Sequence, residues 1–263
     1  DTADFTKPGQ VADLVRAVQP RVIINAAAYT AVDKAESEPD LAHLINATTP
    51  GAIAAEAEQI GALLVHYSTD YVFDGSGHAP RDESAPTAPL SVYGRTKLEG
   101  EQQIIDSGCR HLILRTSWVY AARGGNFAKT MLRLAAERDE LKVINDQIGA
   151  PTGADLLADI TAHAVRAAQA NPSLAGLYHL VADGETSWYD YARYVIEWAR
   201  KQGHALRVEP DKIIAVPTTE YPTPARRPLN SRLATDKLKQ AFGLTLPHWQ
   251  QGVERMLTEH LGK

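Results

Sequence analysis

The stretch LLVHYSTDYVF, residues 63–73, decides the fold expected for this chain. It is an apolar run that follows Gly61 and ends in hydroxyls, a carboxylate and a phenol. A continuous apolar run with such boundaries is typical of a strand buried on both faces of a parallel sheet. Ligands of open α/β sheets bind beyond the carboxyl ends of their strands, so residues 68–70 lie where a site would be built. We interpret His66, inside the run, as a structural histidine with a satisfied hydrogen bond.

Other apolar runs alternate with segments of helical spacing, which indicates βαβ units and a parallel sheet. Strands are expected at residues 21–28, 62–68, 111–116, 141–144 and 176–181. Helices are expected at residues 10–18, 40–60, 92–105, 126–138, 154–168 and 188–200, with a return to helix over 235–261. The fold class is therefore α/β, a Rossmann-type doubly wound sheet with a smaller C-terminal substrate-binding lobe. We assign residues 1–120 and 153–182 to the Rossmann-type core, and 121–152 and 183–263 to the smaller lobe.

Composition excludes several classes of protein. The 263 residues are 44% hydrophobic and 22% charged, which is ordinary for a globular chain with a sizeable core. A formal charge of −5 gives no electrostatic footprint for nucleic acid. Cys109 is the single cysteine, so no internal disulfide is possible and a reducing compartment is favoured. No apolar stretch is long enough to span a bilayer, and we expect a soluble cytoplasmic protein that does not bind membranes.

The segment VYGRTKL, residues 92–98, carries the most informative pair of side chains. Tyr93 and Lys97 are four residues apart, which places them on one face of a helix. A nearby positive charge favours the phenolate, so we expect Lys97 to lower the pKa of Tyr93 toward working pH. Such a phenol can exchange a proton with a carbonyl or carbinol oxygen. Alone the pair is a weak signal, and a packed tyrosine with a solvated lysine is the competing interpretation.

Several long segments together resemble a known family. They are NAAAYTAVDKAE (25–36), YSTDYVF (67–73), RTSWVY (115–120), NFAKTM (126–131), NDQIGAPT (145–152) and PTPARRPLNSRL (222–233). In this order they resemble the extended short-chain dehydrogenase/reductases that act on nucleotide sugars. Within that family they are most similar to the branch that reduces dTDP-4-dehydro-L-rhamnose to dTDP-L-rhamnose, which supplies cell-surface polysaccharide such as the O-antigen of lipopolysaccharide.

The resemblance implies an NADPH- or NADH-dependent oxidoreductase. It makes residues 1–120 and 153–182 the dinucleotide-binding domain, and residues 121–152 and 183–263 the nucleotide-sugar substrate lobe. Tyr93 resembles the family's proton donor, and Lys97 the partner that also holds the nicotinamide ribose. Thr69 corresponds to the hydroxyl that completes this catalytic triad. Most of the acceleration would come from placing hydride donor and proton donor on one carbon.

The cofactor would also meet residues after the first expected strand and near the start of the chain. Ala28, Tyr29 and Thr30 follow that strand, where small side chains let the backbone approach a cofactor closely. Asp4 and Phe5 resemble the pair that borders the adenine. Each of these could instead be plain loop structure, and the fold topology favours the functional interpretation.

Substrate contacts are implied for two groups of residues. Tyr71, next to Asp70, separates the family's branches, because the related dehydratases place a glutamate there as the base for water elimination. Trp118 resembles the aromatic that contacts the sugar, although a tryptophan at a strand end is commonly a core residue. Arg226 and Arg227 suit a diphosphate, which a guanidinium grips with two hydrogen bonds. Together with Thr69, these are the expected substrate-binding residues.

The sequence departs from the family pattern in two places. No G-x-G-x-x-G run occurs, so we expect the first strand and glycine-rich turn, which seat the cofactor pyrophosphate, to be missing from the given chain. Some members place Mg²⁺ between the subunits of a homodimer. Asp155 and Glu259 sit at matching positions, but Asp155 is shorter than the usual glutamate. The resemblance thus allows, without requiring, Mg²⁺ and a homodimer.

Two alternatives stay open. The first is a reductase or epimerase acting on another nucleotide sugar. The second is a non-catalytic partner, because the regulatory β subunit of methionine adenosyltransferase resembles the same family. A fold and a Tyr/Lys pair do not by themselves establish turnover.

Overall fold

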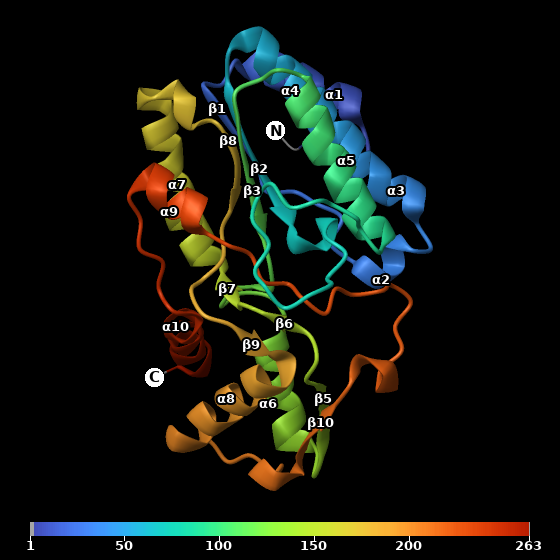
Figure 1. Ribbon diagram of the computed structural model, residues 1–263, viewed down its shortest axis with the longest axis vertical. Coiled ribbons are helices and arrows are strands. Elements are labelled where there is room, and N and C mark those ends of the chain that lie inside the picture. Colours follow the sequence, from blue (N-terminus) through green and yellow to red (C-terminus); the bar gives the residue numbers. More distant parts are fainter. Residues whose placement is uncertain (1–2, 263) are drawn as a thin grey trace.

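A four-stranded parallel sheet forms the middle layer of the upper part of the computed structural model, which describes residues 3–262 (Figure 1). Its strand order is β1 (Val22–Asn25), β2 (Leu63–Thr69), β3 (His111–Thr116) and β8 (Gly176–His179). Each neighbouring pair is parallel, so the carboxyl ends of all four strands meet at one edge. The parallel α/β sheet expected from the apolar runs is confirmed.

Helices cover both faces of this sheet (Figure 1). On one face α1 (Pro8–Val18), α4 (Thr49–Ile60) and α5 (Val92–Asp106) pack over a cluster that includes Leu64 and Ile113. On the other face α7 (Ala154–Ala170) and α9 (Asp236–Phe242) pack over one that includes Leu63, Val65 and Leu112. Successive residues of a strand point to opposite faces, so an uninterrupted apolar strand serves both layers. Burial of each leucine side chain contributes roughly 1.5–3 kcal/mol to the free energy of unfolding.

The second lobe is built from α6 (Phe127–Glu137), α8 (Trp188–Lys201) and α10 (Trp249–Leu261). A two-stranded parallel sheet of β5 (Leu141–Ile144) and β10 (Ile213–Val216) packs against α8. Two short pairs lie between the lobes, β4 (Val119–Tyr120) with β7 (Thr152–Gly153) and β6 (Ile148–Gly149) with β9 (Thr186–Ser187). The sequence did not predict β10 or these four short strands.

Two expected helices differ in the structure. The helix expected over 235–261 is broken, because α9 ends at Gly243 in the left-handed conformation and α10 begins at Trp249. The helix expected over 40–60 consists of α3 (Pro39–His43), a π-helical turn (Leu44–Thr48) and α4. Short helical turns complete the fold: α2 (Val32–Ala35) and the 3₁₀ turns Asp70–Val72, Pro172–Leu174, Pro210–Lys212 and Thr218–Glu220. Among the described residues, no helix is both long and apolar enough to cross a membrane.

Candidate active site

The start of α5 packs directly against the end of β2. Ser91 caps the helix by accepting a hydrogen bond from the Gly94 amide. A Cβ added at Gly94 would lie 2.3 Å from the Tyr71 carbonyl oxygen, so only glycine permits this approach. The packing brings Tyr93 edge-on to Tyr71, with ring centroids 5.4 Å apart, and into polar contact with the Thr69 hydroxyl. Two members of the expected triad, Tyr93 and Thr69, therefore lie together beside Tyr71.

The expected phenolate is not what the structure supports. Burial raises the pKa of the Tyr93 phenol to about 12, although the contact with Thr69 opposes the shift. The Lys97 amine does not counter this, because it bonds elsewhere. Our expectation that Lys97 lowers the pKa of Tyr93 is therefore wrong for this arrangement. The phenol is protonated at neutral pH, which is the state that a proton donor needs.

Lys97 is buried beneath Tyr93 and bonds to β2. Its Nζ lies 2.6 Å from the Tyr67 carbonyl oxygen and 3.1 Å from Nε2 of His66. Burial lowers the pKa of Lys97 to about 8, and Glu101 acts in the opposite direction. His66 is fully buried and its Nδ1 lies 3.0 Å from Nδ2 of Asn25. The expectation of a hydrogen-bonded structural histidine is thus confirmed, with the addition that the histidine contacts Lys97.

Asp70 is a buried carboxyl beside this group. The Thr69 hydroxyl lies 3.2 Å from its Oδ1, and Ser231 makes a further polar contact. Its Oδ2 is buried and has no hydrogen-bond partner among the described residues. Burial raises the pKa of Asp70 to about 6, because the charged form loses its hydration.

A cavity of about 700 Å³ opens next to this corner and extends into the second lobe. Tyr71 and Asp33 form its wall on the side of the Rossmann-type domain, and Arg227 of the C-terminal segment is paired with Asp33 there. The far wall comes from the second lobe and includes apolar and charged side chains of α6, β5 and α8: Phe127, Met131, Leu134, Arg138, Lys142 and Trp188. A concave site with an apolar lining and a few convergent charges suits an extended ligand with an aromatic base and charged groups.

The two expected arginines have different environments. Arg227 is half-buried, bonds both carboxylate oxygens of Asp33 at 3.1 and 2.8 Å, and contacts Tyr71. Arg226 is exposed, and its side chain has no hydrogen-bond or ion-pair partner among the described residues. Only Arg227 lines the cavity.

Trp118 lies behind the cavity wall. Its backbone has a left-handed φ of 48°, and its ring stacks on Trp188 with centroids 3.6 Å apart. Trp188 itself lines the cavity and donates a hydrogen bond to Gln147 at 3.1 Å. The expected aromatic residue, Trp118, is thus next to the cavity. Its stacking partner Trp188, which the sequence did not single out, forms part of the cavity wall.

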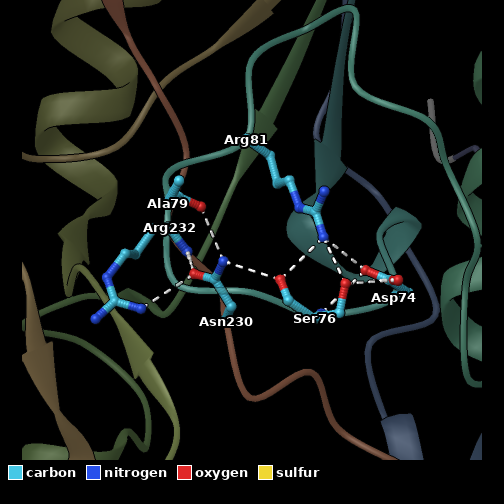
Figure 2. A network of polar contacts seen from close by, with 6 residues as sticks. All are labelled: Asp74, Ser76, Ala79, Arg81, Asn230 and Arg232. Carbon is cyan, nitrogen blue, oxygen red and sulfur yellow. Dashed lines mark hydrogen bonds and ion pairs between the residues drawn. The ribbon is translucent and has the colours of Figure 1, made fainter.

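A polar network holds the segment that carries Arg227 and Ser231 (Figure 2). Asn230 donates from its amide to the carbonyl oxygens of Ala79 and Ser76, at 2.9 and 3.3 Å, and accepts from the Arg232 amide. Arg81 donates to Asp74 and Ser76 at 2.8–2.9 Å and so closes the loop on itself. The loop after β2 and the C-terminal segment therefore form one unit beside Asp70.

The residues expected to meet the cofactor lie in two places. Ala28, Tyr29 and Thr30 follow β1 at the carboxyl edge of the sheet, as expected. The Tyr29 hydroxyl donates to Glu38 at 2.6 Å, so its ring is held by α3 and its neighbours. Asp4 and Phe5 precede α1, where Asp4 accepts hydrogen bonds from Thr6 and the Phe5 carbonyl accepts one from Thr49.

The two carboxylates expected to bind magnesium line one small cavity of about 90 Å³. Asp155 forms an ion pair with Arg255, which occupies the same cavity as Glu259. Within residues 3–262, no three acidic, histidine or cysteine side chains gather as a metal site. The geometry gives no support to Mg²⁺ at this position.

Asn46 shows what the sequence left undetected. Its side chain accepts from the Tyr29 amide at 2.8 Å and donates to the Tyr29 carbonyl at 3.1 Å. The π-helical turn, with its extra residue, places Asn46 there, and such turns occur often at functional sites. The sequence signal available for Asn46 was a polar residue on an otherwise apolar helix face. No such signal marked Ser231, because its neighbour in space, Asp70, is far away in sequence.

Comparison with known proteins agrees with this geometry. The family described as "RmlD substrate binding domain" matches residues 1–261. The dTDP-4-dehydrorhamnose reductase of Escherichia coli K12 is 63% identical over 97% of this chain and 85% of its own length. The enzyme of that name from Burkholderia thailandensis is 46% identical, over 96% and 86%.

A solved structure agrees as well. The dTDP-4-dehydrorhamnose reductase of Bacillus anthracis in complex with NADP is 38% identical, with a TM-score of 0.88 over 97% of this chain and 86% of that one. Sequence identity, coverage and fold point the same way, and the chain belongs to the dTDP-4-dehydrorhamnose reductase family.

Proposed function

We propose that this protein is an NAD(P)H-dependent reductase that converts the C4 ketone of dTDP-4-dehydro-L-rhamnose into the hydroxyl of dTDP-L-rhamnose. The observation that carries the proposal is the contact between the Tyr93 phenol and the Thr69 hydroxyl at the carboxyl end of β2. This pair lies beside the large cavity, in a chain of the reductase family.

In this reaction the side chains move one proton and hold the substrate. Tyr93 donates its phenolic proton to the alkoxide oxygen that develops at C4, and Thr69 orients that oxygen. Lys97, whose amine bonds the Tyr67 carbonyl oxygen rather than the phenol, is proposed to hold the nicotinamide ribose. The bound cofactor supplies the hydride. Tyr71 cannot serve as the base of a water elimination, which favours reduction over dehydration.

The residues present fit one part of a nicotinamide dinucleotide. Ala26 and Ala27 are small and exposed at the end of β1, so a ligand can approach their backbone. The NADP complex of the Bacillus anthracis relative supports a nicotinamide cofactor for this chain. We propose Asp4, Phe5, Ala28, Tyr29, Thr30 and Lys97 as cofactor contacts. Asp70, Tyr71, Trp118 and Arg227 are proposed for the substrate, whereas Arg226, which is exposed and does not line the cavity, is not.

We keep the division into a cofactor domain, residues 1–120 and 153–182, and a substrate lobe, residues 121–152 and 183–263. The four-stranded sheet and the large cavity support it, although α9 of the lobe packs on the sheet. A dTDP-sugar is the proposed partner, and homodimer formation stays a prediction for sedimentation analysis. We propose no magnesium site at Asp155, because this carboxylate is neutralised by its ion pair with Arg255.

The test is cofactor oxidation by the purified protein on adding dTDP-4-dehydro-L-rhamnose, with NADPH and NADH compared. UDP- and GDP-linked 4-keto sugars serve as competing substrates. Preferential turnover of the dTDP sugar supports the proposal. Preferential turnover of another sugar nucleotide would establish the first alternative. If no keto sugar is turned over and the protein co-purifies with a methionine adenosyltransferase, the non-catalytic alternative replaces it.

A further inference from the structure

A line of buried polar side chains runs from β1 to α5 beneath the candidate proton donor. Asn25 contacts His66 at 3.0 Å, His66 contacts Lys97 at 3.1 Å, and Lys97 contacts the Tyr67 carbonyl at 2.6 Å. Asn25, His66 and Lys97, which contribute side chains to this line, are only 4%, 0% and 1% exposed. Because bulk water does not reach them, they must satisfy one another's hydrogen-bonding groups.

The hydrogen-bond donors and acceptors of these side chains decide where each proton lies. The Asn25 Oδ1 accepts a hydrogen bond from the Ala27 amide at 3.1 Å, so its NH₂ faces Nδ1 of His66. Nδ1 must then accept, which places the ring proton of a neutral His66 on Nε2. This Nε2–H points at Lys97. An ammonium has only donors, so the arrangement is fully satisfied only when the Lys97 amine is uncharged.

We propose that His66 is a positioning residue for Lys97 and that its ring proton changes nitrogen when Lys97 gains or loses its charge. With an uncharged amine, Nε2–H of His66 donates to Lys97. With an ammonium, Lys97 donates to Nε2, and the ring proton lies on Nδ1. The Asn25 amide must then reverse to accept it, and Ala27 loses its acceptor.

The surroundings place this exchange close to neutral pH. Burial lowers the pKa of Lys97 to about 8, and burial together with Lys97 holds the pKa of His66 well below its usual value. Glu101, one turn later on α5, is paired with Arg115 of β3 at 2.6 Å, so it only partly compensates an ammonium. Tyr93 lies one turn before Lys97, and Asp70 follows the end of β2. His66 therefore stays neutral in both arrangements.

The exchange connects Lys97 to the loop that follows β1. The charge on Lys97 determines the orientation of Asn25, and Asn25 determines whether the Ala27 amide is bonded. The same loop carries Ala28, a proposed cofactor contact. In this respect the inference rests on the proposed function, and cofactor affinity should depend on pH around the Lys97 midpoint.

Nuclear magnetic resonance of the ligand-free protein tests the inference without turnover. Ring-¹⁵N histidine labelling reports which nitrogen of His66 carries the proton, and the ¹³Cε shift of Lys97 reports its charge. We expect the proton on Nδ1 below the Lys97 midpoint and on Nε2 above it. Asn25→Asp exchanges a single heavy atom, and its carboxylate accepts from both Ala27 and Nδ1. This variant should keep the proton on Nδ1 at every pH and raise the Lys97 midpoint by one pH unit or more.

Asn171→Asp is the matched control, because it adds the same charge at an exposed turn far from the sheet edge and should behave as wild type. A His66 proton that stays on one nitrogen while Lys97 titrates would overturn the inference. So would an Asn25→Asp spectrum that matches the control. If Asn25→Asp does not fold, the wild-type titration decides alone. Neither result depends on substrate, so the reductase proposal stands or falls separately.

Discussion

Tyr93 and Asp70 lie in the same buried corner, and burial favours the protonated form of both. The pKa is raised to about 12 for the phenol and to about 6 for the carboxyl. A proton donor benefits from this environment, because it keeps its proton until the alkoxide develops. A carboxylate does not, because its charge loses hydration and receives few hydrogen bonds in return. Burial therefore keeps Tyr93 in the form that can donate a proton, and the same burial makes the Asp70 carboxylate destabilise the folded protein.

Replacing Tyr93 by phenylalanine removes the proton and keeps the ring packing against Tyr71. We expect kcat to fall by about 10²–10⁴-fold, the usual contribution of a positioned general acid. Steady-state kinetics, with cofactor and dTDP titrations by calorimetry, would separate chemistry from binding. A Tyr93→Phe enzyme with wild-type kcat would show that another group supplies the proton.

Replacing Asp70 by asparagine should remove a pH-dependent loss of stability. The folded-state pKa of about 6 lies above the usual value near ~4, so the folded protein releases this proton later than the unfolded chain. Stability from this group is fully present below about pH 4 and is lost as pH rises through 6. Relative to wild type, Asp70→Asn should gain about 2–3 kcal/mol between pH 4 and pH 7. Urea unfolding of both proteins at a series of pH values measures the difference, and parallel curves would contradict it.

At the scale of elements, α5 is held against the end of β2 by a contact that allows no side chain. The Cβ of an alanine at Gly94 would lie 2.3 Å from the Tyr71 carbonyl oxygen, a backbone atom that moves only with its segment. A similar approach occurs at Gly100, where a Cβ would lie 2.1 Å from the Asn46 carbonyl oxygen. These two glycines therefore fix how closely α5 lies to the turn after β2 and to the π-helical turn whose Asn46 bonds Tyr29.

Gly94→Ala should displace Tyr93 from Thr69 by shifting the first turn of α5. Overpacking of this kind costs about 1–3 kcal/mol, and a misplacement near 1 Å can reduce turnover by about 10²-fold. Gly9→Ala is the control, because Gly9 lies in α1 with nothing within 4 Å of an added Cβ. The control should be slightly more stable, by about 0.5–1 kcal/mol, and fully active. Thermal unfolding and kinetics of both variants check this, and equal activities would refute the positional argument.

The elements of the sheet were largely predictable from the sequence, and the reason is local. Leu63 and Leu64 must both be apolar because each faces a different helical layer, and this leaves an unbroken pattern. The π-helical turn around Asn46 has no such pattern in the sequence, and it packs against Gly100 of α5, which is more than fifty residues away. The strand Ile213–Val216 follows a short irregular region and pairs with β5 about seventy residues earlier, so its identity depends on tertiary contacts.

At the scale of the whole molecule, the cavity is formed by segments that are distant in sequence. Asp33 and Arg227 meet across 194 positions, and Asn230 bonds to Ala79 across 151. The family resemblance grouped Tyr93, Lys97 and Thr69, which one strand and the next helix of a βαβ unit carry. It could not place Ser231 or Trp188, because no local pattern records which loop closes over the sheet edge.

The network in Figure 2 should therefore control how firmly substrate is held. Asn230 is 3% exposed, and Asn230→Ala removes the donor to the Ala79 and Ser76 carbonyls and the acceptor of the Arg232 amide. Each hydrogen bond of this kind contributes about 0.5–1.5 kcal/mol to the free energy of unfolding. We expect a clear loss of stability and a raised KM for the sugar nucleotide, with cofactor affinity retained. Chemical unfolding and kinetics measure both, and an unchanged KM would separate the network from the substrate segment.

Arg226 and Arg227 give the sharpest comparison at this scale, because they are neighbours of the same charge in different environments. Arg227 lines the cavity beside Tyr71 and is already oriented by Asp33, whereas Arg226 is exposed. A guanidinium held in place loses little freedom when it binds a diphosphate. Arg227→Ala should weaken binding of dTDP and its sugar by about 10–100-fold, as expected for a charge-assisted hydrogen bond worth about 1.5–3 kcal/mol.

Arg226→Ala, the matched control, should change dTDP affinity less than threefold at physiological salt, since an exposed charge is screened over about 8 Å. Calorimetric titration of both variants with dTDP, at low and at physiological salt, compares them directly. Equal losses would mean that the loop acts through its net charge and that Asp33 plays no part in orienting the phosphate ligand. A larger loss in Arg226→Ala would place the diphosphate outside the cavity, on the exposed side of the loop.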